Sequence, residues 1–303
     1  MGQSCGAVKP LPPDVWRQII SVHCDVYPAI FVCKMLHAIA MSTPLTIKTR
    51  KYPALTNQQA ARLNIIDLDL HYHSKITTID PLTSLRRLVL RHVAVASLGT
   101  LTRLEKLSLF YADILDDSLY SLTTLQSIDI SGVVKIDTGK LTSLVNLRAM
   151  YWGTKDFAPF LVPLTQLSTL HFGIFASAPM LQSLCIQHLN ISYNKNFRNG
   201  HIAGMQLVSL KISGSYITST AVRGMTTLTN LGASMCQIHT DDLPVSLTWL
   251  NIAMCNGDLR GVPALTQLTF LNASGTNITV DDIRKMTSLR RAIIGSFEDV
   301  QLG

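Results

Sequence analysis

Residues 101–109 read LTRLEKLSL, and residues 82–90 read LTSLRRLVL. Both stretches carry apolar residues at positions i, i+3 and i+5, as in Leu104, Leu107 and Leu109. This pattern recurs twelve times between residues 65 and 294, and the first members of successive triads lie 19–23 residues apart. A regular repeat of this length predicts a chain built from many similar coils.

The LxL part of each triad is predicted to form a short strand whose two apolar side chains point inward, and one coil alone cannot bury them. Burial of one large aliphatic side chain stabilises a fold by about 1.5–3 kcal/mol, so neighbouring coils must stack. The twelve triads are Ile65/Leu68/Leu70, Leu85/Leu88/Leu90, Leu104/Leu107/Leu109, Leu125/Ile128/Ile130, Leu144/Leu147/Ala149, Leu167/Leu170/Phe172, Ile186/Leu189/Ile191, Leu207/Leu210/Ile212, Leu228/Leu231/Ala233, Leu247/Leu250/Ile252, Leu268/Leu271/Ala273 and Leu289/Ala292/Ile294.

The spacing and the LxxLxL core are similar to those of leucine-rich repeat proteins, and the resemblance covers roughly residues 63–297. It implies an α/β fold, a horseshoe-shaped solenoid of about twelve coils of 19–23 residues. The segments DDSLYSL (116–122) and VDDIRKM (280–286) begin or nearly begin with Asp, a residue typical of helix N-caps. We therefore expect single helical turns on the convex side and one continuous core through the array.

A different pattern precedes the repeats. Residues 11–40 read LPPDVWRQIISVHCDVYPAIFVCKMLHAIA and predict two helical pieces separated by Tyr27-Pro28. Leu11-Pro12, Asp14-Val15-Trp16, Ile19-Ile20 and Val32-Cys33-Lys34 resemble an F-box, the helical module that docks on a Skp-type adaptor of cullin-based ubiquitin ligases. The resemblance implies that these side chains face the adaptor or pack the helices together: Leu11, Pro12, Val15, Ile19, Ile20, Val32 and Leu36. The alternative is a dedicated cap over the first coil.

The predicted organisation therefore has four parts. Residues 1–10 form a flexible N-terminus, and residues 11–44 form the F-box-like helical module. Residues 45–62 serve as linker and N-terminal cap, and residues 63–303 form the leucine-rich repeat solenoid.

The formal net charge of +7 is unevenly distributed, because residues 1–62 hold +5 of it and residues 63–303 only +2. This balance indicates no uniformly basic surface, so we do not expect nucleic acid as the main partner. Lys48, Arg50 and Lys51 form the one tight basic cluster. We interpret it as a solvated loop, with a weak anion or nucleic-acid contact as the alternative.

The six cysteines are scattered without a CxxC pair, and no apolar run approaches 18 residues. These features favour reduced thiols in an intracellular protein, cytoplasmic or nuclear, without membrane contact. Cys236 and Cys255 are predicted to be buried thiols that face backbone groups in their turns.

Motifs of enzyme chemistry are absent from the sequence. There is no HExxH, no P-loop, no GxGxxG after a strand and no GxSxG. His71 and His92 lie one coil apart and His73 falls in a turn, so we do not expect them to share a metal. The sequence therefore predicts a protein that is not an enzyme and that holds no cofactor.

Strand residues that alternate with the buried leucines should line the concave face, where such solenoids usually bind partners. Two groups there differ from a neutral polar sheet, and both consist of Arg and aromatic residues of the kind enriched at interface hot spots. The first group is Arg87, Arg91, Lys106, Phe110, Arg148 and Met150, with Tyr111 and Tyr151 on the neighbouring rim. The second is Trp249 and Phe270, which lie on adjacent strands and can pack side by side. We predict both as partner-binding sites, with ordinary scattered surface aromatics as the alternative.

The order of an F-box-like module followed by repeats is also that of F-box/leucine-rich-repeat proteins. The resemblance implies a substrate-recognition subunit of a cullin-type (SCF) ubiquitin ligase, whose partners are a Skp-type adaptor with its cullin complex and an unknown protein target. The alternative is a leucine-rich repeat scaffold or inhibitor whose N-terminus acts only as a cap. A third hypothesis is nucleic-acid binding through the basic residues of the first group.

Overall fold

A computed structural model of the chain describes residues 42–51, 55–72, 74–132, 136–150, 158–173, 181–295 and 298–301. The chain divides into two compact units, Met1–Leu125 (unit 1) and Gln126–Gly303 (unit 2). The predicted N-terminus and all seven adaptor-facing residues, from Leu11 to Leu36, lie outside the described residues. One continuous core through residues 63–303 stays a prediction.

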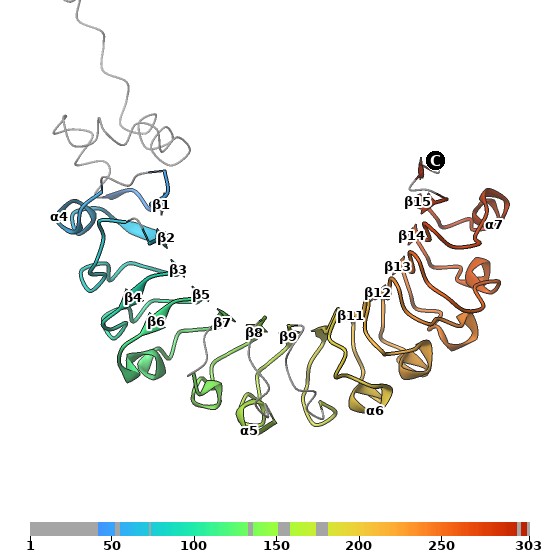
Figure 1. Ribbon diagram of the computed structural model, residues 1–303, viewed down its shortest axis with the longest axis horizontal. Coiled ribbons are helices and arrows are strands. Elements are labelled where there is room, and N and C mark those ends of the chain that lie inside the picture. The colour runs from blue at the N-terminus through green and yellow to red at the C-terminus, as the bar shows by residue number, and fades with distance from the viewer. Residues whose placement is uncertain are drawn as a thin grey trace, which may run out of the picture. The chain divides into compact units, whose positions relative to one another are not determined.

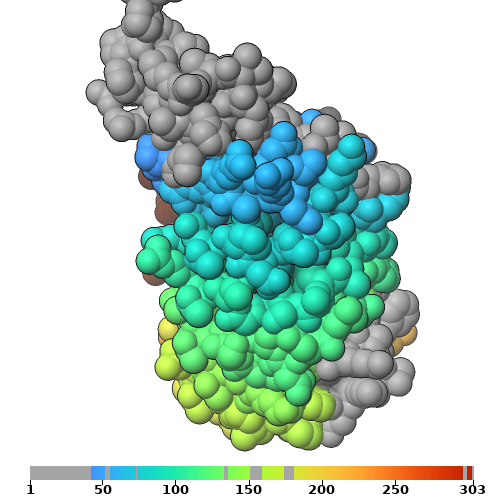
Figure 2. Space-filling model, turned by 90° about the vertical axis from the view of Figure 1, so that its left-hand side faces the viewer, coloured from blue at the N-terminus to red at the C-terminus, as the bar shows by residue number. Residues whose placement is uncertain are grey.

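Unit 1 is built from coils that each contribute one strand to a parallel sheet. Its elements are β1 (Leu45–Lys48), α4 (Asn57–Ala60), β2 (Ile65–His71), β3 (Arg87–Arg91), β4 (Ala94–Val95), β5 (Lys106–Phe110), β6 (Asp113–Ile114) and the 3-10 helix η2 (Asp117–Ser121). Strand β2 pairs in parallel with β1 and β3, and β3 pairs in parallel with β5. Figure 2 shows the coils of this unit stacked in chain order, from blue to green.

Unit 2 repeats the same arrangement over more coils. Its elements are β7 (Ser127–Ser131), η3 (Thr138–Lys140), β8 (Asn146–Ala149), α5 (Ala158–Leu161), β9 (Thr169–Phe172), β10 (His188–Asn190), α6 (Asn199–Ile202), β11 (Ser209–Lys211), η4 (Ser219–Val222), β12 (Asn230–Gly232), η5 (Thr240–Asp242), β13 (Trp249–Asn251), η6 (Val262–Ala264), β14 (Phe270–Asn272), α7 (Val280–Arg284), β15 (Arg291–Ile294) and β16 (Glu298–Gln301). The strands β7 to β15 pair in parallel in chain order, and within the unit they lie opposite the helical turns (Figure 1).

The core of each unit consists of the triad side chains. No residue of the twelve triads exposes more than 3% of its surface. The register places equivalent triad members side by side, so that Leu88 lies between Leu68 and Leu107 in the sheet of unit 1. The predicted inward orientation of the triads is therefore confirmed.

The two ends of the described chain are covered by strands. Within residues 45–62, which we expected to cap the array, strand β1 pairs with β2 and buries Leu45 and Ile47. Helix α4 begins at a capping box in which Thr56 and Gln59 bond each other's backbone N–H groups. At the other end, β16 pairs antiparallel with β15. The repeat pattern does not predict β16.

The segments opposite the strands form short helical turns, as expected. The side chain of Asp116 accepts a hydrogen bond from the backbone of Ser118 at 3.0 Å and so begins η2. In α7 the N-cap is Thr279, which accepts from the N–H of Asp282, while Asp281 and Asp282 occupy the first helical turn. Acidic side chains in the first turn also interact favourably with the positive N-terminal end of the helix dipole.

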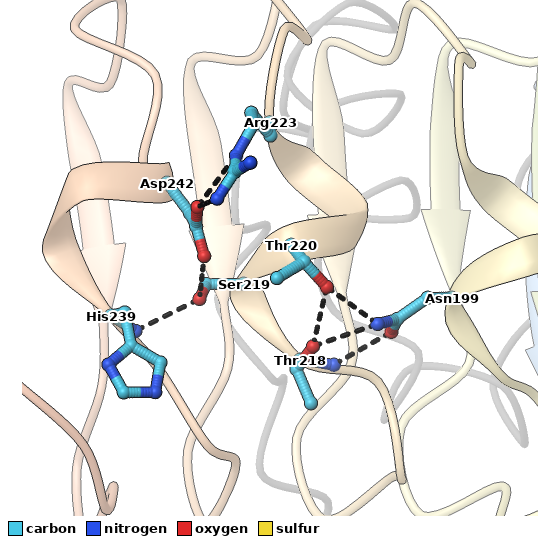
Figure 3. Close-up of polar contacts among 7 residues, drawn as sticks. All are labelled: Asn199, Thr218, Ser219, Thr220, Arg223, His239 and Asp242. Atoms are coloured by element: carbon cyan, nitrogen blue, oxygen red, sulfur yellow. Dashed lines mark hydrogen bonds and ion pairs between the residues drawn. The ribbon is translucent and has the colours of Figure 1, made fainter.

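A polar network ties these turns together in unit 2 (Figure 3). The amide of Asn199 in α6 donates to Thr218 at 2.8 Å and to Thr220 at 2.7 Å, one coil further on. In the same coil Ser219 is buried and donates to the carboxylate of Asp242 at 2.9 Å. Three successive coils are thereby joined by side chains on the side opposite the sheet.

Asp242 is the charged centre of this network, since its side chain is only 4% exposed. Burial alone would raise the pKa of Asp242, but hydrogen bonds from Arg223 and Ser219 and the charge of Arg223 outweigh that effect. The pKa of Asp242 is therefore lowered, and the carboxylate is ionised in the folded protein at neutral pH.

We predict that Asp242→Ala lowers the free energy of unfolding by about 1–3 kcal/mol, because the buried Ser219 hydroxyl loses its acceptor. Because the pKa of Asp242 is lower in the folded protein than in the unfolded chain, its carboxylate stabilises the fold at pH values above the unfolded pKa. This stabilisation is lost as the pH falls through the folded pKa. The difference between the wild type and the variant in urea denaturation should therefore shrink below about pH 4. The exposed Asp281→Ala is the matched control and should cost about 0.5 kcal/mol or less; equal losses in both variants would contradict the prediction.

Candidate functional site

The surface of interest in each unit is its strand face, which consists of the strand side chains that alternate with the buried triads. In unit 1 the structure places four of the predicted site residues on this face. Lys106 and Arg87 are exposed, and Arg91 and Phe110 are half-buried. They come from the adjacent strands β3 and β5, so the structure brings them together.

The two arginines of this group are paired with carboxylates of the preceding strand. Arg87 Nη1 lies 3.0 Å from Asp67 Oδ2, and Arg91 Nε lies 3.0 Å from Asp69 Oδ1. The alternation of side chains along the strands puts all four residues on the same face, but the sequence alone does not reveal that the register joins them in pairs. The arginine charges are therefore partly neutralised within the sheet, whereas Lys106 has no ion pair with any described residue.

The aromatic residues of unit 1 form a connected group at one edge of this face. The guanidinium of Arg91 lies over the ring of Phe110, 4.6 Å from its centroid. His92 stacks on Tyr111 with ring centroids 5.3 Å apart and an interplanar angle of 9°. Tyr72 approaches His92 edge-on at 6.2 Å.

His92 and Tyr111 also share an unusual backbone position, two residues after the third triad member, which we name the rim position. The residues with left-handed φ at rim positions include five that are not glycine: His92, Tyr111, Tyr193, Met235 and Met254. Gly132, Gly214 and Gly275 occupy the same position in other coils with similar φ. The left-handed conformation costs a non-glycine residue about 1–2 kcal/mol.

Hydrogen bonds between coils impose this conformation. The N–H of Tyr193, Met235 and Met254 each donates to a carbonyl of the next coil, at 2.6, 2.9 and 2.8 Å. All three side chains are large and between 45% and 54% exposed. Folding alone favours glycine at such a position, so strained, exposed aromatic and Met side chains point to a binding surface. Sequence analysis missed these three residues, although their alignment with the rim glycines was a signal.

The strand face of unit 2 carries the remaining predicted residues. Arg148 Nε in β8 lies 3.6 Å from Asp129 Oδ2 in β7. Met150, two residues after Arg148, is half-buried. Desolvation, together with the charges of Arg148 and Lys211, lowers the pKa of His171 to about 4. Tyr151, predicted at the rim, lies outside the described residues. The structure thus divides the first predicted group between the two units.

Trp249 and Phe270 are direct neighbours in the register of β13 and β14. Their rings stack with centroids 5.3 Å apart and an interplanar angle of 6°, and the guanidinium of Arg291 lies 5.8 Å from the centre of Phe270. The predicted side-by-side packing is confirmed. Beside Trp249, the absence of a side chain at Gly232 helps to form a hollow of about 220 Å³ that Lys211 also lines.

We predict that Trp249 and Phe270 stabilise the fold jointly. In a double-mutant cycle of Trp249→Ala and Phe270→Ala, the coupling free energy should be about 0.5–1.5 kcal/mol, because offset aromatic pairs contribute this much beyond area burial. Urea denaturation of the four proteins measures it. Trp249→Ala combined with the distant, exposed Val162→Ala serves as the control and should be additive; a Trp249/Phe270 coupling of zero would sink the prediction.

The turn cysteines are structural groups. Cys236 Sγ donates to the carbonyl of Ile212 at 3.2 Å, and Cys255 Sγ donates to that of Ala233 at 2.8 Å. Burial raises the pKa of both thiols, that of Cys255 to about 11. The prediction of buried thiols facing backbone groups is confirmed, and neither group suits nucleophilic chemistry.

We therefore predict selective labelling of the cysteines. Iodoacetamide at pH 8 should modify the exposed Cys185 in the native protein but leave Cys236 and Cys255 unmodified until urea unfolds the chain. Mass spectrometry of proteolytic peptides distinguishes the three positions. Native-state modification of Cys255 at the rate of Cys185 would show that the thiol is accessible after all.

Within the described part of the chain, no group of three or more His, Cys, Asp or Glu residues is arranged to hold a metal ion. None of the helices in these segments combines the length and the apolar character that a membrane crossing requires.

Comparisons with known proteins agree with the fold. No protein-family model and no curated protein matches the sequence. TLR13 in complex with ssRNA13 is 16% identical with a TM-score of 0.55, over 78% of this chain and 41% of that one. A leucine-rich repeat protein from Leptospira interrogans is 18% identical with a TM-score of 0.51, over 82% and 69% of the two chains. An internalin from Listeria monocytogenes is 18% identical over 93% and 97%, with a TM-score of 0.49.

At these identities the similarity concerns the fold alone. The predicted leucine-rich repeat fold is thus confirmed, with a mainly parallel sheet and few helices. The chain spans well under half of the TLR13 chain that it matches.

Proposed function

We propose that this chain is a protein-binding leucine-rich repeat protein that serves as the substrate-recognition subunit of a cullin-type ubiquitin ligase. Residues 11–40 dock on a Skp-type adaptor, and the strand faces with their rims capture the protein target. The protein is not itself an enzyme in this proposal.

The observation that carries the binding role is the strained rim. Tyr111, Tyr193, Met235 and Met254 expose large side chains at positions where glycine would cost the fold less. Aromatic, Met and Arg side chains are enriched at the centres of protein interfaces, and the neighbouring strand faces hold Arg87, Phe110 and Trp249. A protein partner therefore fits this chemistry better than a small metabolite does.

The ligase role rests on the sequence resemblance of residues 11–40 to an F-box. The rival proposal is a scaffold or inhibitor whose first residues act only as a cap. It predicts that no adaptor copurifies and that deletion of residues 1–44 leaves target binding unchanged.

The nucleic-acid hypothesis has less support than it had from the sequence. The arginines that suggested it are paired with Asp67, Asp69 and Asp129 on the same strand faces. These ion pairs interrupt the continuous cationic track that a phosphodiester backbone needs.

The ligase role predicts that purified wild-type protein retains a purified Skp-type adaptor in a pull-down. The double variant Leu11→Ala, Ile19→Ala should reduce retention at least about tenfold, because interface anchors typically contribute 2 kcal/mol or more. Leu115→Ala is the matched control, since Leu115 is 71% exposed in unit 1 and should leave retention unchanged. Failure of the wild type to bind would refute the ligase role.

A further inference from the structure

The turn that follows β1, at residues 49–51 of unit 1, is held in place by tertiary hydrogen bonds. The N–H of Lys51 donates to the carbonyl of Lys48 at 2.9 Å and closes the turn. The buried Thr49 donates to the carbonyl of Asp69 through its N–H at 2.9 Å and through its hydroxyl at 3.1 Å. Its hydroxyl also accepts from the N–H of His71 at 3.0 Å. The three charged side chains are exposed, as the interpretation of a solvated loop expects, but the turn that carries them is anchored to β2.

This anchored turn presents three cations that form no ion pair within the described part of the chain. The side chains of Lys48, Arg50 and Lys51 are exposed, and none forms an ion pair with any described residue. The contrast with Arg87 and Arg91, which are each paired with an Asp of the preceding strand, is direct. The three exposed positive charges thus lie within four residues of one anchored turn, which favours the approach of an anion.

The same turn forms one side of a hollow. Lys48, Arg50 and Lys51 face Arg91, Phe110 and Tyr111 across a space of about 520 Å³. His71 and His92 complete its wall, and Asp69, which is paired with Arg91, is the one carboxylate that lines it. One side of the hollow is thus cationic, and the other is aromatic.

The aromatic side is held by several side-chain contacts. His92 and Tyr111 stack at left-handed rim positions, and Arg91 is fixed between Asp69 and the ring of Phe110. Because the side chains of this wall are already positioned by these contacts, they lose little conformational entropy when a ligand binds.

We propose that this hollow binds an acidic peptide segment of the protein target, with its carboxylates on Lys48, Arg50 and Lys51 and an apolar or aromatic side chain against His92 and Tyr111. The proposal rests on the protein-binding role proposed above. The hollow is far larger than an inorganic anion, which would leave the aromatic wall unused. An extended nucleic-acid strand would continue along a strand face on which Arg87 and Arg91 are already paired with Asp67 and Asp69, so it would not meet a continuous cationic track there.

Calorimetric titration of the full-length protein with a defined probe tests the proposal. The probe is a seven-residue peptide of Asp and Glu around one central Tyr, with blocked ends. We expect saturable binding that weakens as salt rises. The same peptide with Asn and Gln in place of the acids should not bind measurably. Absence of binding by the acidic peptide at millimolar concentration would overturn the proposal.

Two variants locate the site. Lys48→Gln with Arg50→Gln should weaken binding about tenfold or more, since each charge pair near 4 Å is worth about 1 kcal/mol even in water. The matched control, Lys75→Gln with Arg103→Gln, removes the same charges from exposed positions of unit 1 and should change the affinity less than about twofold. An equal loss of peptide affinity in both double variants would show that only the net charge of the protein matters, and it would contradict the proposed site.

His92→Gly tests the aromatic wall without threatening the fold, because glycine suits the left-handed φ of 53° at this position. The variant should keep or gain thermal stability while its affinity for the acidic peptide falls several-fold. Unchanged affinity would remove the aromatic wall from the proposal.

A single-stranded oligonucleotide of seven nucleotides, titrated in parallel, separates the two kinds of polyanion. Weaker binding than the acidic peptide supports the proposal, and tighter binding with the same dependence on Lys48 and Arg50 overturns it in favour of nucleic acid. The adaptor pull-down is independent of these titrations. Loss of adaptor binding with intact peptide binding would refute the ligase role alone, and the reverse result would refute the hollow alone.

Discussion

The contact between the triad side chains of neighbouring coils is the constraint on which the rest of the structure depends. A coil has no interior of its own, so Leu88 is buried only because Leu68 and Leu107 lie on either side of it. This contact sets the register of every parallel strand. Since side chains alternate along a strand, the register in turn decides which residues form the strand face and which become neighbours there.

Register explains why the strand face is more than a set of exposed residues. It places Arg87 directly beside Asp67, and Trp249 directly beside Phe270, although each pair is about twenty residues apart in sequence. The same coil-to-coil pairing continues past the strands as backbone hydrogen bonds at the rim, which hold Tyr193 and Met235 in a left-handed conformation. One repeated contact therefore orders the core, the face and the rim.

The sequence was sufficient for the parts of the fold that depend on periodicity. Triads, strands and most outward-facing residues follow from apolar spacing alone, although Val89 at an outward position is buried, and Asp116 was recognisable as an N-cap. The ion pair of Arg91 with Asp69 and the buried carboxylate of Asp242 were not predictable, because each depends on which side chains meet across coils. Strand β16 was missed because its residues, Glu298–Gln301, follow no repeat and find their place only against β15.

The basic turn shows how tertiary contacts change the meaning of a charge cluster. In the sequence, Lys48, Arg50 and Lys51 look like any solvated run of cations, and the intervening Thr49 carries no signal. In the fold, Thr49 is buried and ties the turn to Asp69 and His71, so the three charges cannot separate as they would in a free loop. Asp residues neutralise Arg87 and Arg91 on the same sheet, yet no carboxylate within the described ranges forms an ion pair with this turn. In the proposed complex, an acidic ligand in the hollow brings carboxylates to these three cations beside the aromatic wall, so its binding would stabilise the folded protein.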